Sequence, residues 1–160
     1  MEFISSPNRR VVPGRKISAI VIHYTASLSI EGTIAWFRNR AAQVSAHYVI
    51  GRDGRTVQMV KDADVAWHAG ASSLGGVPNV NQFSLGIELV GTADSGFTDS
   101  QMKALYELLE TLVTQYKIPA GRVVGHSTIS PGRKIDPEGF NNQFNWTKTR
   151  EVCAKAFPCD

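Results

Sequence analysis

Two segments of this sequence, residues 17–23 (ISAIVIH) and 84–90 (SLGIELV), are predominantly apolar, as expected for buried strands of a sheet. The residues around them predict five further elements. They are a helix over 30–38, a hairpin of strands 45–50 and 56–60, a helix from 99 to about 116, a short strand at 122–125 and a last helix over about 146–156. This order of strands, hairpin and helical crossovers predicts an α/β fold with a central mixed β-sheet flanked by helices.

Capping signals mark where two of the helices begin. Ser29 is placed to cap the helix at 30–38. Thr98 and Gln101 have the spacing of a capping box, and the apolar residues that follow recur at helical spacing. One face of this second helix is therefore expected to lie in the core.

The remaining stretches are expected to lack regular structure. Residues 1–16 predict an irregular N-terminal arm, and residues 61–82 predict a long surface loop of the kind that carries binding groups. Asp53-Gly54 favours a type I′ turn in the hairpin. With 160 residues, 42% of them apolar, the chain has enough material for one core and too little for two domains with a cleft between them. Residues 17–160 are therefore expected to form one domain.

Charge and hydropathy restrict the partners. The net charge is +3, and the basic cluster within residues 9–16 is typical of a solvated arm rather than a nucleic-acid-binding stripe. No apolar run approaches the ~20 residues of a membrane span, and residues 1–16 lack the apolar core of a signal peptide. Cys153 and Cys159 are equally compatible with a disulfide, which would suggest an oxidising compartment, and with two free thiols.

Two of the four histidines, His23 and His126, come at the ends of predicted strands. A lone histidine in such a place is usually solvated or packed in the core, but two in one small domain raise the prospect that they meet. Zinc binds neutral imidazole and carboxylate ligands in a tetrahedral array, and a catalytic site leaves one position for water. Asp136, ten residues after His126, is the candidate third ligand.

Glu88 and Lys134 are the other candidates for chemistry. Glu88 lies in an apolar strand, where a carboxylate is costly unless it is paired or functional. Partial desolvation would raise its pKa and suit it to proton transfer, whereas the alternative is an ion pair with a surface Lys or Arg. Lys134 is either a solvated loop charge or a cation directed at a developing oxyanion.

Together these residues resemble the zinc-dependent N-acetylmuramoyl-L-alanine amidases of the type 2 class, which share a fold with phage amidases and peptidoglycan-recognition proteins. The matching segments occur in family order and cover about residues 17–140. They are residues 21–26 (VIHYTA), 44–50 (VSAHYVI), 52–54 (RDG), 66–70 (AWHAG), 84–91 (SLGIELVG), 125–127 (GHS) and 131–137 (PGRKIDP). The AmpD-type enzymes are the subgroup that the chain resembles most.

The resemblance implies a role for each candidate. It assigns one Zn²⁺ per chain to His23, His126 and Asp136, general acid and base catalysis to Glu88, and transition-state stabilisation to Lys134.

The same resemblance implies a set of residues that line the substrate cleft. They are Tyr24, His47, Trp67, His68 and Arg133. For His47, the alternative to lining the cleft is a supporting or packing role behind it. For Trp67, the alternative is packing in the core.

The activity implied by the resemblance is hydrolysis of the amide between N-acetylmuramic acid and L-alanine in peptidoglycan or muropeptides. The main alternative is a non-catalytic peptidoglycan-binding domain of the same fold, and a metalloprotease is a third. The expected partner is peptidoglycan or a muropeptide, without nucleic acid or an integral membrane segment, and a monomer is expected. An extracytoplasmic location (periplasmic, outer-membrane associated or secreted) is favoured, with a cytoplasmic recycling enzyme or a phage lysin as alternatives.

Overall fold

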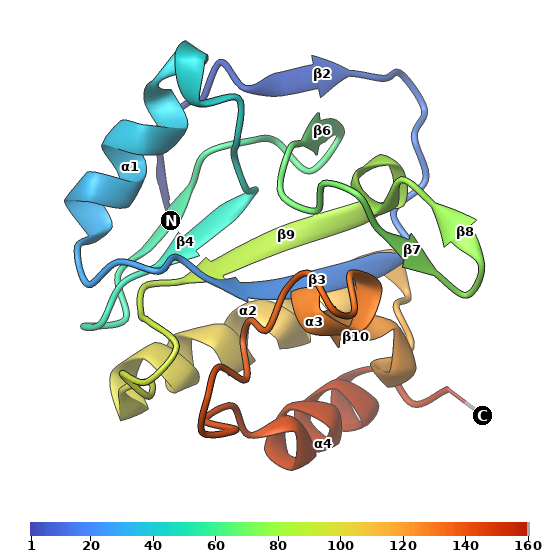
Figure 1. Cartoon of the computed structure of the whole chain (residues 1–160). Helices are drawn as coiled ribbons and strands as arrows, with labels where there is room; N and C mark the ends of the chain where they lie inside the picture. Colours follow the sequence, from blue (N-terminus) through green and yellow to red (C-terminus); the bar gives the residue numbers. More distant parts are fainter. Residues whose placement is uncertain (160) are drawn as a thin grey trace.

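The computed structural model describes residues 1–159, and its centre is a six-stranded sheet (Figure 1). In spatial order the strands are β1 (Glu2–Phe3), β5 (Thr56–Gln58), β4 (Tyr48–Ile50), β9 (Ser84–Leu89), β3 (Ala19–Tyr24) and β10 (Val123–Gly125). Only β4 and β5 pair antiparallel, while the other neighbours are parallel. The predicted α/β class, with a mixed sheet flanked by helices, is confirmed.

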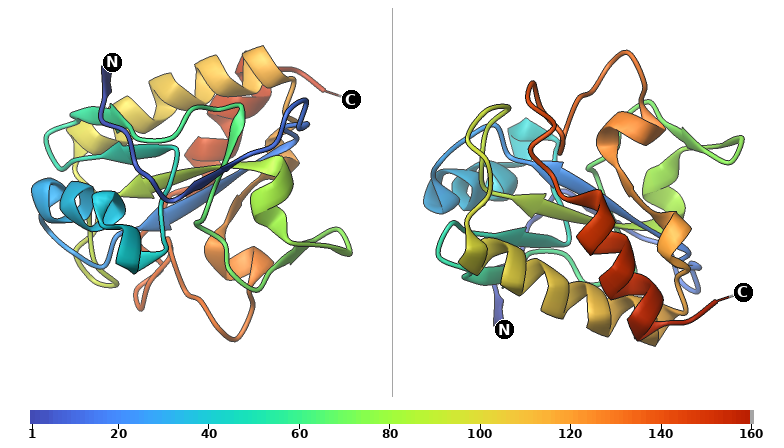
Figure 2. Two further views of the ribbon diagram at one scale, coloured as in Figure 1. Left: turned by 90° about the horizontal axis from the view of Figure 1, so that it is seen from above. Right: turned by 90° about the horizontal axis from the view of Figure 1, so that it is seen from below.

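One face of the sheet is covered by α2 (Asp99–Tyr116) and α4 (Trp146–Ala156), which cross beneath it in the right-hand view of Figure 2. Because side chains alternate between the two faces of a sheet, every second residue of a strand points into this core. Ile22 of β3 and Ile87 of β9 pack there against Leu105 of α2. Burying this apolar surface supplies the main stabilisation of the fold.

The opposite face is covered in two separate places. Near β4, α1 (Ile30–Arg38) packs Ile34 and Phe37 onto the sheet. Near β10, α3 (His126–Ile129) packs Ile129 onto it. A cavity lies on this face, and its lining includes Trp36 and Phe37 of α1 and His126 at the start of α3.

The capping signals are confirmed. Ser29 Oγ accepts a hydrogen bond from the Gly32 N–H at 2.9 Å, and α1 begins at the next residue. The capping box of Thr98 and Gln101 forms at the start of α2. Both helices, and α4, have the predicted ranges.

The N-terminal arm is more regular than predicted. β1 pairs with β5 and so extends the sheet by one strand, while β2 (Arg9–Val11) pairs antiparallel with β6 (Asp64–Ala66). The prediction failed because these residues carry no strand pattern of their own. They are ordered by an edge whose backbone groups would otherwise be unpaired.

The stretch 61–82 is likewise not a plain loop. Besides β6 it contains a small hairpin and a 3₁₀ turn, and two further 3₁₀ turns lie elsewhere in the chain. These elements are β7 (Ser73–Leu74), β8 (Val77–Pro78), η2 (Val80–Phe83), η1 (Arg40–Ala42) and η3 (Ala120–Arg122).

One local expectation is corrected, and the structure favours one of two open alternatives for Cys153. The hairpin turn is not type I′, because Gly54 has a positive φ of 89° but Asp53 does not, and its carboxylate instead accepts from the Arg55 N–H. Cys153 is a buried free thiol in α4 whose pKa is raised to about 11 by burial, so the disulfide alternative is not realised. Across residues 1–159, no helix has the length and apolar character needed to cross a bilayer.

Candidate metal centre

Three buried side chains from distant parts of the sequence meet above the ends of β3 and β10. The Nδ1 atoms of His23 and His126 lie 3.0 Å apart. The Oδ2 atom of Asp136 lies 3.2 Å from the first and 3.3 Å from the second. Zinc bonds of about 2.0–2.1 Å in a tetrahedron place neighbouring ligand atoms about 3.3 Å apart. This triangle therefore has the size of one face of a zinc coordination shell.

The sheet register brings the two histidines together. β3 and β10 are parallel, and Ile22 pairs with Gly125, so His23 and His126 follow on neighbouring positions. Gly125 also lets the Asp136-Pro137 segment approach, because a Cβ at this position would lie 2.8 Å from Pro137 Cδ. The strand register thus places the two histidines side by side, and the absence of a side chain at Gly125 lets Asp136 approach them.

The protonation of the ring nitrogens suits a cation. His126 Nε2 donates to the Ala69 carbonyl at 2.9 Å, which leaves the lone pair of Nδ1 facing the triangle. Burial lowers the pKa of His23, which favours the neutral form of this ring. Asp136 Oδ2 faces both Nδ1 atoms, so a carboxylate oxygen completes the triangle. Two imidazole lone pairs and a carboxylate would repel one another at this distance unless a divalent cation lay between them.

Glu88 borders the triangle. It pairs with His23 in the parallel register of β9 and β3, so both side chains lie on the same face, and Oε1 is 3.9 Å from His23 Nδ1. Its Oε2 is buried and has no hydrogen-bond partner among the described residues. Burial, reinforced by the negative charge of Asp136 and opposed by Lys134, raises the pKa of Glu88 well above its usual value. This carboxylate is therefore suited to exchange a proton near neutral pH.

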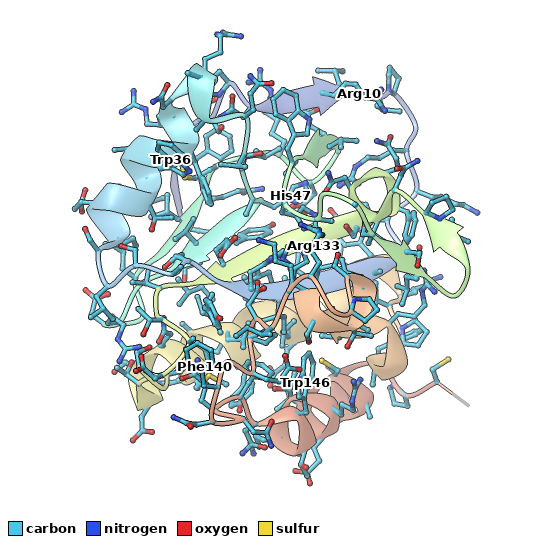
Figure 3. All side chains as sticks on the ribbon, viewed as in Figure 1. Arg10, Trp36, His47, Arg133, Phe140 and Trp146 are labelled. Carbon is cyan, nitrogen blue, oxygen red and sulfur yellow. The ribbon has the colours of Figure 1, made fainter. Side chains whose placement is uncertain are left out.

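A cavity of about 890 Å³ opens above these residues. Its lining includes Glu88, Lys134 and four of the five residues predicted for the cleft. These four are Tyr24, Trp67, His68 and Arg133. Arg133, which lies centrally in Figure 3, donates through Nη2 to the carbonyls of Ala69 and Ala71. The cavity therefore has a cationic wall beside the metal triangle.

His47 does not line this cavity. It is fully buried, its Nδ1 accepts from the Gly86 N–H at 3.0 Å, and its Nε2 donates to the Asp64 carbonyl at 2.8 Å. Both ring nitrogens are thus occupied by backbone groups, and the alternative of a role behind the cleft fits this geometry. His68 touches the cavity but is only 8% exposed, and both of its nitrogens contact other side chains.

The sequence predictions missed an apolar wall of the cavity. Trp36, labelled on α1 in Figure 3, is 55% exposed. It lines the cavity together with Val44 and Ile135. Trp36 lies off the face through which Ile34 and Phe37 enter the core. A large aromatic residue on the polar face of an amphipathic helix was the signal that would have identified it.

Comparison with known proteins places this geometry in a family. Residues 13–139 match the family described as N-acetylmuramoyl-L-alanine amidase. The 1,6-anhydro-N-acetylmuramyl-L-alanine amidase AmpD of Haemophilus influenzae is 46% identical over 107 residues, which cover 66% of this chain and 56% of that protein. The N-acetylmuramoyl-L-alanine amidase AmiD of Escherichia coli is 31% identical over 159 residues, covering 89% and 55%. The chain thus spans little more than half the length of these curated relatives.

Solved structures share the fold. An AmpD crystal structure superposes with a TM-score of 0.78 at 32% identity and covers 95% of this chain and 93% of that chain. Escherichia coli AmiD in complex with the substrate anhydro-N-acetylmuramic acid-L-Ala-D-γ-Glu-L-Lys gives a TM-score of 0.78 at 30% identity, covering 89% and 60%.

Proposed function

Because this chain belongs to the N-acetylmuramoyl-L-alanine amidase family, we propose that it hydrolyses the amide between N-acetylmuramic acid and L-alanine with the help of one bound Zn²⁺. The observation that carries the proposal is the buried triangle of His23, His126 and Asp136 with the carboxylate of Glu88 beside it. A cation site, a base and an open cavity are the parts that metal-assisted hydrolysis requires.

The three triangle residues would hold the metal. A bound Zn²⁺ would lower the pKa of a water molecule and polarise the scissile carbonyl. His126 contributes a ring held in one tautomer by the Ala69 carbonyl. Asp136 contributes the negative charge that a divalent ion favours.

Glu88 is the proposed general base and acid. Its raised pKa and its Oε2, which makes no hydrogen bond to any described residue, suit it to accept a proton from the attacking water. The same carboxylic acid then donates that proton to the departing nitrogen of L-alanine. Lys134, on the cavity wall, is the proposed donor to the tetrahedral oxyanion.

The proposed substrate is a 1,6-anhydro-muropeptide. The AmpD relatives are named for this group, and the AmiD structure holds an anhydro-muramyl tripeptide. Arg133 lines the same cavity, and its recorded hydrogen bonds use Nη2. We propose that the other edge of this guanidinium pairs with a carboxylate of the stem peptide.

The experiment is a product analysis with three substrates: an anhydro-muropeptide, intact sacculi and the free stem peptide. We expect the Zn²⁺-loaded protein to release a peptide with an L-alanine N-terminus from the muropeptide, detected by mass spectrometry, and a chelator to stop the release. Cleavage within the free stem peptide would favour a metalloprotease. Binding without release at saturating Zn²⁺ would favour a non-catalytic domain. Activity on sacculi would extend the proposal to intact peptidoglycan.

Three expectations stay predictions: one domain over residues 17–160, the monomeric state and the extracytoplasmic location. The buried thiol of Cys153 removes the argument from a disulfide for an oxidising compartment.

A further inference from the structure

The two histidines of the metal triangle are held in different ways. His126 Nε2 faces a backbone carbonyl, which can only accept, so the ring tautomer is fixed directly. His23 Nε2 instead lies 3.0 Å from Nδ1 of another imidazole, that of His68. An imidazole nitrogen is either a donor or an acceptor, so this contact alone does not decide which nitrogen of His23 carries the proton.

The hydrogen bonds of Ser84 decide which nitrogen of His68 carries the proton, and therefore which nitrogen of His23 does. Ser84 Oγ lies 2.7 Å from the Val80 carbonyl and must use its single proton there. It can therefore only accept from His68 Nε2, which is 3.1 Å away. Neutral His68 with its proton on Nε2 presents a lone pair at Nδ1, and this lone pair accepts from His23 Nε2.

We propose that His68 and Ser84 are positioning residues that fix the tautomer of His23, so that its Nδ1 lone pair faces the metal. The inference rests on the proposed function only in that the triangle holds a metal. It also changes the role predicted for His68, because a ring with both nitrogens engaged has none to offer a substrate.

The fold is built around this ring. A Cβ on Gly86 would lie 2.5 Å from His68 Cγ, so only glycine at this position of β9 lets the ring lie against the sheet. The Asn81 carboxamide oxygen accepts from the N–H groups of His68 and Ala69, which fixes the backbone on either side. One backbone segment thus supplies the His68 ring, which orients His23, and the Ala69 carbonyl, which orients His126.

The discriminating substitution is Ser84→Ala, which removes the acceptor for His68 Nε2 without touching His23. His68 then gains the alternative tautomer with its proton on Nδ1, which donates to His23 Nε2 and moves the His23 proton to Nδ1, facing the metal position. Removing such an outer hydrogen bond typically weakens metal binding by about 10–100-fold. We expect a rise of that size in the Kd for Zn²⁺, measured by competition with a chromophoric chelator.

Ser6→Ala is the matched control. Ser6 is also fully buried, donates to a carbonyl (Phe37) and accepts an N–H (Asn8), but it lies outside the cavity lining. We expect it to lose comparable thermal stability and to keep the wild-type Kd for Zn²⁺. His68→Phe keeps the ring volume but removes both nitrogens, and we expect at least the effect of Ser84→Ala.

A second readout needs neither metal nor activity. Long-range ¹⁵N–¹H spectra of the metal-free protein identify which imidazole nitrogens are protonated. We expect Nε2 to be protonated in both His23 and His68 of the wild type, and protonation of His68 Nδ1 to appear in Ser84→Ala. A wild-type His68 protonated at Nδ1, or a Kd in Ser84→Ala no higher than in Ser6→Ala, would overturn the proposal. A wild type that binds no Zn²⁺ would refute the proposed function, and the spectra would still decide the tautomer.

Discussion

Glu88 lies beside the metal triangle with one carboxylate oxygen that makes no hydrogen bond within the described chain. If it shuttles the proton, Glu88→Gln keeps the size of the side chain but removes the base. We expect kcat to fall by at least about 100-fold, the low end of a general base contribution, while the Kd for Zn²⁺ stays near that of the wild type. Steady-state kinetics on an anhydro-muropeptide measure kcat, and competition with a chelator measures the Kd for Zn²⁺. Unchanged turnover would remove Glu88 from the mechanism.

His47 gives a prediction on stability and pH. Burial, opposed by the Asp64 carbonyl and assisted by the charge of Arg15, lowers its pKa from 6.5 to about 4. The unfolded chain therefore takes up the proton first as the pH falls. The stability contributed by neutral His47 is complete above pH 6.5 and is lost progressively toward pH 4. The loss is about 3 kcal/mol.

The measurement is a pair of experiments. We expect NMR titration of the metal-free protein to show a neutral His47 ring down to pH 5. Urea unfolding between pH 7 and 4 should lose less stability in His47→Gln than in the wild type, which separates His47 from His23 and His68. A ring that titrates near pH 6.5 would contradict the prediction.

At the scale of elements, β9 serves both faces of the sheet. Its odd-numbered residues enter the core beneath α2, while Gly86 supports the His68 ring and Glu88 enters the cavity. The period of two along a strand is what allows six residues to serve packing and chemistry together. The alternation of Leu85, Ile87 and Leu89 against Glu88 was readable from the sequence for the same reason.

The start of α2 provides a test at this scale. Thr98 Oγ1 accepts from the Gln101 N–H and donates to the Arg52 carbonyl, so it ties the helix to the hairpin. We expect Thr98→Ala to lower the free energy of unfolding by about 1–2 kcal/mol, measured by urea unfolding, with wild-type kcat. Ser29→Ala, which removes an exposed cap of α1, is the control with an expected loss at the lower end of that range. Equal stability of Thr98→Ala and the wild type would show that the cap contributes nothing.

At the scale of the whole molecule, the metal triangle links β3, the first residue of α3 and the loop before Pro137. Without a cation, two lone pairs and a carboxylate face one another at 3.0–3.3 Å. We therefore expect a chelator to lower Tm and Zn²⁺ to restore it. Free Zn²⁺ at about 100 times Kd should add about 2.7 kcal/mol of stability. Differential scanning calorimetry measures the shift.

Asp136→Ala is the control for that shift. It removes one ligand, so we expect the rise in Tm with Zn²⁺ to be largely lost. A rise equal to that of the wild type would mean that the stabilising ion binds elsewhere.

Much of the fold and of the candidate site could be predicted from the sequence. The strand patterns, the caps of α1 and α2 and the helix α4 follow from local periodicity and capping chemistry, which act over a few residues. The triangle residues were identifiable as candidates because His23 and His126 end predicted strands and Asp136 follows ten residues after His126, and the family resemblance implied a zinc-binding role for all three. Tyr24, Trp67 and Arg133 followed from the same resemblance and do line the cavity.

Local sequence could not reveal what depends on partners far along the chain. β1 and β2 exist because the edges of β5 and β6 accept them. His47 carries the same side chain as a cleft histidine, and only its burial between Gly86 and Asp64 excludes it from the cavity. Trp36 lines the cavity because α1 packs beside the cavity, and the residues next to Trp36 in the sequence do not indicate this.

The sequence alone determined which residues face the core and which carry chemistry, because side-chain type and period fix these over a few positions. The tertiary structure decided which of those residues meet. The parallel register of β3, β9 and β10 places His23 beside Glu88 and His126, and Gly125 and Gly86 let Pro137 and His68 approach. Distances of 3 Å between atoms more than 100 residues apart arise from packing, which no local pattern encodes.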